Sequence, residues 1–305
     1  MSELIKVRDK KKSLIADLGL LMVALIWGAG FLVMKDSLSR ITPIYLNGIR
    51  FILAFFVMMI LFWKKMKKVT KQDILGGSIV GVILCAAFVT QTIGLQYTTV
   101  SKSAFLTGTN VIMVPFLAWM LYRKYPGWYA MMGAVLAAIG IGLLTIHGSL
   151  SIGIGDSLTL VCAFLFAAHI VSVGYFGENM DPYVLATIQI GVTGILGMIG
   201  GFLFEPTPEG LGSSIGIAII YLVFFSTMGA LLLQNVAQKY TYSTHAAIIL
   251  SLESVFGTIL GVLVMGDMFT LQMFFGCVLI FFGIIITETH LSFFASKKQK
   301  DKKIA

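Results

Sequence analysis

Charged residues are scarce in this 305-residue sequence, where 12% of positions are Asp, Glu, Lys or Arg and 58% are hydrophobic. A soluble globular domain carries about twice that charged fraction, roughly 25%. The composition therefore excludes a soluble protein and indicates a chain that crosses a membrane several times. The formal net charge of +8 does not indicate nucleic-acid binding, because the basic residues form short clusters between apolar segments.

The sequence also lacks the motifs of several functional classes. Cys85, Cys162 and Cys277 each stand alone in an apolar run, which favours neither a disulfide framework nor a zinc site. No GxxxxGK[ST] loop is present to bind ATP. A nucleophile with its base and clustered metal ligands are also missing, so we expect no enzyme activity, no cofactor and no metal. Two other classes of membrane protein, an integral-membrane enzyme and a channel or sensor subunit, nevertheless stay open as alternative functions.

Ten apolar segments of bilayer length fill most of the chain. A helix needs about 20 residues to cross a hydrocarbon core of roughly 30 Å. We place the segments at residues 15–34, 43–62, 74–95, 102–122, 128–146, 154–176, 183–204, 215–238, 243–265 and 270–289. The connections between them are mostly short, so the sequence predicts an all-α integral membrane protein whose function lies within the helix bundle.

The basic residues predict how the chain is oriented. Most of them fall on the side of the amino terminus, in residues 6–12, 64–71, 123–124 and 297–303, whereas the other side has only Lys35, Arg40 and Lys102. Cytoplasmic loops carry an excess of Lys and Arg. We therefore expect an inner or plasma membrane protein with both termini in the cytoplasm, as basic tails at 1–14 and 290–305.

The two halves of the chain are related as an internal repeat. Residues 15–146 align with residues 153–289, five apolar segments in each. The aligned pairs include Pro43 with Pro182, Trp27 with Phe166, Gln91 with Gln234, and Asn110 with Glu253. Because five is odd, the second half enters the membrane from the opposite side, which predicts two inverted repeats around a central polar cavity.

Four stretches carry a resemblance to a known family: LIWGAGFLVMK, NGIRF, SAFLTGTNVIMVPFLAWML and LSLESVFGTILGVLVMGD. Over about residues 15–289 the chain resembles the EamA-type branch of the drug/metabolite transporter superfamily. The resemblance implies a ten-helix, two-repeat carrier that moves small organic solutes, often outward, with both termini in the cytoplasm. The ninth segment departs from the family pattern, since Glu253 is followed by Ser254 where the family often has the proline that kinks the helix.

Glu253 lies in the middle of an otherwise apolar segment. A central acid costs about 2.5–3.5 kcal/mol on insertion scales, so the side chain is expected to face protein or water. Gly257 and Gly261 follow it on the same helical face and allow another helix to approach. Glu253 is either a proton-coupling or ammonium-binding group, or a structural hydrogen-bonding group.

Further polar and aromatic residues are candidates for the cavity wall. Arg50 is expected to bind a substrate carboxylate, to pair with Glu253, or to extend to the membrane interface. A lone histidine such as His169 is more often a helix contact than a metal ligand. Ser103, Thr107 and Asn110 share one face of the fourth segment. The candidate substrate-binding residues are Trp27, Phe31, Asn47, Arg50, Gln91, Thr107, Asn110, His169, Gln234, Asn235 and Glu253.

Together these features predict a secondary active or facilitative transporter that works by alternating access. We expect it to export small organic metabolites such as amino acids or amphipathic compounds, with protons as a candidate coupling ion and membrane lipids as its surroundings. A carrier of phosphorylated or nucleotide-linked solutes is the alternative, although Arg50 is the only basic residue deep in a segment. Both a monomer and a homodimer stay open.

Overall fold

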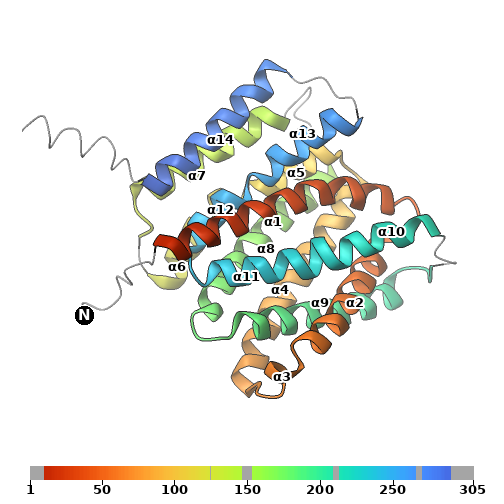
Figure 1. Cartoon of the computed structure of the whole chain (residues 1–305). Coiled ribbons are helices and arrows are strands. Elements are labelled where there is room, and N and C mark those ends of the chain that lie inside the picture. Colours follow the sequence, from red (N-terminus) through yellow and green to blue (C-terminus); the bar gives the residue numbers. More distant parts are fainter. Residues whose placement is uncertain (1–9, 124, 146–152, 209–212, 266–269, 290–305) are drawn as a thin grey trace, which may run out of the picture.

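The computed structural model describes residues 10–123, 125–145, 153–208, 213–265 and 270–289, and these ranges form helices joined by turns and short connections (Figure 1). Six helical stretches in them are long and apolar enough to cross a membrane. They are α1 (Lys10–Ser37), α2 (Pro43–Leu61), α4 (Lys71–Gln96), α8 (Ile154–Gly177), α9 (Pro182–Phe204) and the continuous run from α10 to α11. An all-helical, multi-pass membrane protein follows from these lengths and compositions.

The sixth stretch consists of three successive helices, and further helices lie outside the six stretches. They are α3 (Trp63–Met66), α5 (Val100–Gly108), α6 (Asn110–Tyr122), α7 (Trp128–Thr145), α10 (Ser213–Tyr221), η1 (Leu222–Gly229), α11 (Ala230–Gln238), α12 (Ser243–Leu250), α13 (Glu253–Met265) and α14 (Leu271–Thr289). Each of the ten expected segments is thus mainly helical, but three are not single regular α-helices. Residues 102–122 and 243–265 are each broken into two helices, and η1 interrupts residues 215–238 with π-helical turns. The expected basic tails lie outside the described residues, apart from 10–14.

The break between α12 and α13 arises without a proline. The Leu252 amide donates to the Ile249 carbonyl at 3.1 Å and the Ser254 amide donates to the Ser251 carbonyl at 3.2 Å, so both bonds span three residues instead of four. The Ser251 hydroxyl also donates to the Ile248 carbonyl at 2.7 Å. A local tightening of this kind interrupts the α-helical ladder. Glu253 consequently becomes the first residue of α13.

Glycines bring several helices into close contact. A Cβ atom on Gly197 of α9 would lie 2.8 Å from the Gly48 Cα atom of α2, and one on Gly28 of α1 would lie 2.8 Å from the Glu253 carbonyl oxygen of α13. No real side chain tolerates such distances, so both helix pairs depend on glycine. The expected close approach at Gly257 is therefore present against α1, since its amide nitrogen would lie 2.9 Å from a Cβ on Gly28.

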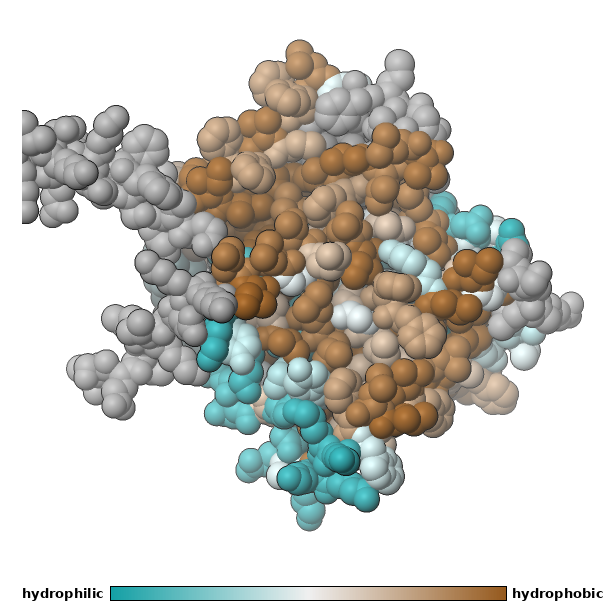
Figure 2. Space-filling model, in the orientation of Figure 1, coloured by the Kyte–Doolittle hydropathy of each residue, from teal (hydrophilic) through white to brown (hydrophobic). Residues whose placement is uncertain are grey.

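Helices from the two halves of the chain pack against each other throughout the bundle. α2 lies along α9, α7 lies along α14, and α4 lies between α8 and α9 (Figure 1). Between these pairs of helices, α1 packs against α11 and α13 (Figure 1). Most of the visible surface beside these helices is hydrophobic, as a lipid-facing surface must be (Figure 2).

Candidate functional site

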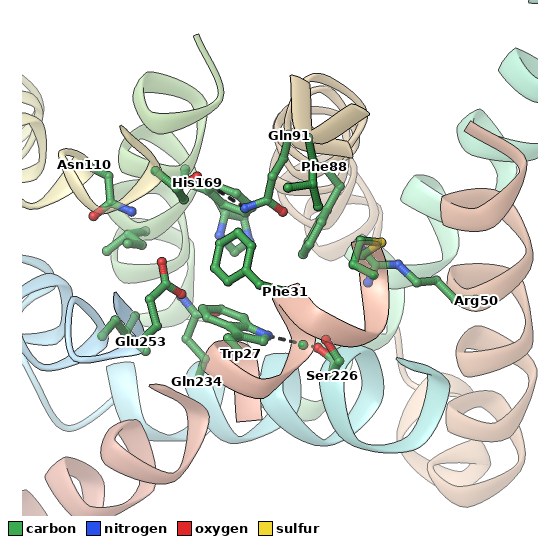
Figure 3. A pocket seen from close by; sticks show the side chains of 17 residues that line it. Trp27, Phe31, Arg50, Phe88, Gln91, Asn110, His169, Ser226, Gln234 and Glu253 are labelled. Atoms are coloured by element: carbon green, nitrogen blue, oxygen red, sulfur yellow. Dashed lines mark hydrogen bonds between the residues drawn. The ribbon is translucent and has the colours of Figure 1, made fainter. Parts of the chain in front are cut away.

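A cavity of about 50 Å³ lies among the helices of both halves (Figure 3). It is lined by Trp27, Gly30, Phe31, Met34, Arg50, Phe88, Gln91, Leu95, Thr107, Asn110, Phe166, His169, Ile170, Ser226, Gln234, Leu250 and Glu253. This volume holds a few water molecules and is well below the roughly 300–1,000 Å³ of a small-molecule pocket. A solute of amino-acid size therefore requires the surrounding helices or side chains to move apart.

The structure brings nine of the eleven candidate residues to this cavity and places Asn47 and Asn235 outside its lining. The Asn47 side-chain amide donates to the Phe88 carbonyl at 3.2 Å and to the Thr92 hydroxyl at 2.9 Å. The Asn235 side-chain amide donates to the Leu231 carbonyl at 2.7 Å. Asn47 therefore bonds to the adjacent helix α4, and Asn235 bonds to the backbone of its own helix, α11.

Arg50 of α2 is fully buried, with no exposed side-chain surface. Its Cζ atom lies 4.9 Å from the centroid of the Phe51 ring and 4.5 Å from that of Phe88. None of its three guanidinium nitrogens donates a hydrogen bond within the described part of the chain. The side chain thus neither reaches the membrane interface nor pairs with Glu253. Contact with two rings compensates a buried charge only partly, because a guanidinium also needs hydrogen-bond acceptors.

Glu253 is the second charged group in the lining, and 7% of its surface is exposed. Its carboxylate forms no hydrogen bond or ion pair with any residue that the structure describes. In Figure 3 it lies near Asn110 at one end of the cavity, whereas Arg50 lies at the other end. The cavity therefore presents a cation and an acid that do not neutralise each other.

Hydrogen bonds hold the part of α1 that carries Trp27, an aromatic residue of the cavity lining, against the π-helical segment η1. The Trp27 indole donates to the Ser226 carbonyl at 3.0 Å, and the Tyr221 hydroxyl donates to the Ile26 carbonyl at 2.7 Å. A π-helical turn leaves carbonyl groups available outside its own ladder and is frequent at functional sites. The irregular helix therefore positions Trp27 against the cavity.

His169 is buried beside the cavity and contacts a side chain of α9. Its Nε2 atom lies 2.8 Å from the Gln189 amide oxygen, while its Nδ1 atom has no partner among the described residues. Because an amide oxygen only accepts, this geometry assigns the proton to Nε2. This bond matches the helix contact expected for a lone histidine, and Nδ1 makes no contact of this kind in the described part of the chain.

Comparison with known proteins identifies the family. The model of the EamA-like transporter family matches residues 14–146 and again residues 153–289. The chain belongs to the EamA-like transporter family. As the sequence resemblance implied, this membership and the apolar helices make it a membrane transporter, and they point away from an enzyme.

Two relatives of this EamA-like protein extend over nearly its whole length. It is 34% identical over 279 residues to an uncharacterized transporter of Archaeoglobus fulgidus, covering 91% of this chain and 87% of that protein. It is 24% identical over 309 residues to the uncharacterized transporter YetK of Bacillus subtilis, covering 95% and 90%. A crystal structure with 16% identity has a similar fold, with a TM-score of 0.75 over 89% of this chain and 95% of that chain.

The cavity of this EamA-like transporter also includes aromatic residues that were not predicted to line it. Phe88 lies one helical turn before Gln91, and Phe166 lies one turn before His169. Residues three positions apart share a helix face, so these phenylalanines could have been found from the polar residues that follow them. Their rings lie 5.1 Å apart in an edge-to-face arrangement and form one wall with Trp27 and Phe31.

Proposed function

We propose that this protein is a secondary carrier that moves small organic solutes by alternating access between two inverted halves, residues 15–146 and 153–289. The packing pattern supports this symmetry. If α1 corresponds to α8, α2 to α9, and α4 to the run from α10 to α11, then the pair α2 and α9 maps onto itself, and the contact of α4 with α8 maps onto that of α11 with α1. Such a pattern is expected of inverted repeats.

The two helix breaks support the same proposal. Thr109 separates α5 from α6, and its amide and hydroxyl both donate to the Leu106 carbonyl, three residues earlier. Leu252, its equivalent in the second half, lies with Ser251 between α12 and α13, and its amide likewise donates to a carbonyl three residues earlier, that of Ile249. Asn110 and Glu253 then begin equivalent helices and both line the cavity. Broken helices at a repeat interface are a common way to build a transporter binding site.

The solute that best fits the cavity is small, partly apolar and zwitterionic, as an amino acid is. The observation that carries this assignment is the presence of two unpaired charged side chains, Arg50 and Glu253, in the wall of one cavity. Arg50 would bind the solute carboxylate through its planar fork of donors, and Glu253 would bind the ammonium group. Trp27, Phe31 and Phe88 would contact the apolar part of the solute.

A phosphorylated or nucleotide-linked solute fits less well. A phosphate dianion favours several cationic groups around it. Arg50 is the only Lys or Arg among the residues that line the cavity. We therefore assign the carrier to solutes with at most one carboxylate near Arg50.

Glu253 also gives the carrier a means of coupling to protons. A buried carboxylate without a partner is costly, so it must be neutralised by a proton or by a cationic solute. Exchange of one for the other would drive the export of a solute ammonium against the entry of a proton. The carrier would then bind protons and solute with unequal affinity in its two states, as coupling requires. We place it in the cell membrane with both termini in the cytoplasm, because of its basic loops.

Counterflow in proteoliposomes tests this function. Vesicles loaded with an unlabelled neutral amino acid should accumulate the labelled form from outside, because only alternating access exchanges solute against the trans pool. Sugar phosphates inside should give no such accumulation. Leakage of label at the same rate from loaded and empty vesicles would indicate a channel, and counterflow of sugar phosphates alone would support the alternative solute class.

A further inference from the structure

A second binding site lies on the surface of the bundle, away from the cavity. A groove of about 370 Å³ is lined by Met59, Trp63, Met66, Lys67, Val69, Ile74 and Ile188. These residues come from the end of α2, from α3 and the following turn, from the start of α4, and from α9. Six of the seven are apolar, and Trp63 and Ile74 are about half exposed, at 52% and 53%. The groove therefore offers an open apolar surface with one cation at its rim.

Positive charge gathers around this groove. Lys64, Lys65, Lys67, Lys68 and Lys71 all lie within eight residues of the chain. Figure 2 shows a hydrophilic projection below the hydrophobic surface, at the place where α3 lies in Figure 1. Such a boundary between apolar and basic surface is where a helix bundle meets lipid headgroups.

The acids nearest in this region already have partners. The Asp181 carboxylate accepts from the Lys65 ammonium at 2.5 Å. Asp73 accepts from the Thr70 amide at 2.9 Å and from the Thr70 hydroxyl at 2.7 Å. The ammonium groups of Lys64, Lys67, Lys68 and Lys71 have no acidic partner among the residues that the structure describes. A cationic excess therefore remains beside the groove.

The short helix that carries these lysines is held in place. The Phe62 ring lies 4.9 Å from the Tyr183 ring, and the Lys65 ammonium lies 4.2 Å from the Tyr183 centroid. Burial raises the pKa of Asp181, but hydrogen bonds from Lys65 and the Tyr183 amide outweigh burial and leave this pKa below its ordinary value. These contacts anchor α3 to the start of α9, so the groove is a fixed feature of the fold.

We propose that this groove binds one anionic phospholipid. The lipid phosphate contacts Lys67, and one acyl chain lies along Trp63, Met59 and Ile74. Lys67 is placed for this role, since its ammonium lies 5.3 Å from the centroid of the Trp63 ring. The amino-terminal end of α4 is a less suitable phosphate site, because the Thr70 hydroxyl already accepts from the Asp73 amide in a capping box. The headgroup is therefore bound by lysine side chains.

Native mass spectrometry of the full-length protein in detergent tests this site with phosphatidylglycerol, phosphatidylcholine and inorganic phosphate as probes. We expect one phosphatidylglycerol molecule to be retained more strongly than phosphatidylcholine, and phosphate alone not to be retained. A lysine near an anionic lipid surface contributes a factor of about five in affinity, so Lys67→Gln should weaken retention by about that factor. Lys67→Arg should keep it, and Lys12→Gln, which removes the same charge from an exposed position at the start of α1, should leave it unchanged.

Three results would overturn the proposal. Equal retention of phosphatidylglycerol and phosphatidylcholine would show that the headgroup charge is not recognised. Unchanged retention in Lys67→Gln would show that the lipid binds elsewhere. Binding of inorganic phosphate with an affinity similar to that of the lipid would assign the lysines to a free anion and leave the apolar groove without a role.

Discussion

Replacing Arg50 separates a binding role from a structural role. The guanidinium is fully buried and has no hydrogen-bond acceptor among the described residues. Methionine keeps most of the apolar length of the side chain but removes the charge. If Arg50 binds a solute carboxylate, Arg50→Met should leave a folded protein that is more stable without solute and that binds the solute more weakly.

The magnitude follows from the environment of the side chain. Apolar replacement of a buried ion pair is often neutral or stabilises by roughly 1–4 kcal/mol, and replacing Arg50 leaves no hydrogen-bond partner behind among the described residues. The lost contacts with the Phe51 and Phe88 rings offset about 0.5–2 kcal/mol of this gain. We therefore expect the free energy of unfolding to rise by on the order of 1–2 kcal/mol. Loss of a buried charge pair with the solute costs about 2–5 kcal/mol of binding free energy, which is at least about thirty-fold in affinity.

Thermal unfolding of purified protein with and without a neutral amino acid measures both effects. Solute at 100 times the natural protein's dissociation constant should stabilise that protein by about 2.7 kcal/mol and should stabilise Arg50→Met by less than about 1 kcal/mol, because thirty-fold weaker binding leaves this concentration only about three times above the variant's dissociation constant. Lys35→Met provides a contrasting control, because the Lys35 ammonium donates to the Leu95 and Thr98 carbonyls at 2.6 and 3.1 Å, so its loss should destabilise. A lower unfolding temperature for Arg50→Met without solute, with solute stabilisation retained, would refute the binding role.

Four further expectations concern other parts of the molecule. Glu253→Gln should abolish accumulation driven by a pH gradient in vesicles while solute-for-solute exchange continues; unchanged pH dependence would remove Glu253 from the coupling mechanism. A Lys68→Cys variant should resist labelling by an impermeant thiol reagent in intact cells, since labelling from outside would contradict the cytoplasmic orientation. Gly197→Val should destabilise by roughly 1–3 kcal/mol through overpacking, whereas Gly216→Val, with nothing within 4 Å of the added Cβ, should change the unfolding temperature little. Because the pKa of Asp181 is lowered on folding, its stabilising effect should be present above its unfolded pKa of about 3.9 and be lost as the pH falls below that value; an Asp181→Asn variant with the same acid-unfolding profile would contradict this.

The helices and much of the cavity lining were predictable from sequence because the membrane imposes strict constraints. Apolar segments of bilayer length must be helical to satisfy their backbone, and a polar side chain within one must face protein or water. Arg50, His169 and Glu253 therefore had to point away from lipid, and all three line the cavity.

The remaining features depend on packing between distant helices. Phe88 and Phe166 line the cavity while Phe56 is 58% exposed, and composition alone does not distinguish such phenylalanines. Asn47 was grouped with the cavity residues because it is polar, but it bonds to α4 instead. That Arg50 and Glu253 stay unpaired depends on how α2 and α13 are placed across the bundle, which no local pattern encodes.

The central claim is that one solute is bound between Arg50 and Glu253. The most direct measurement is counterflow of a labelled neutral amino acid in competition with its methyl ester, which lacks the carboxylate charge, and with its N-acetyl form, which lacks the ammonium. The natural protein should prefer the zwitterion to both. Arg50→Met should lose the preference over the methyl ester alone, and Glu253→Gln should lose the preference over the N-acetyl form alone. Equal loss of both preferences in both variants, or no preference in the natural protein, would contradict the account.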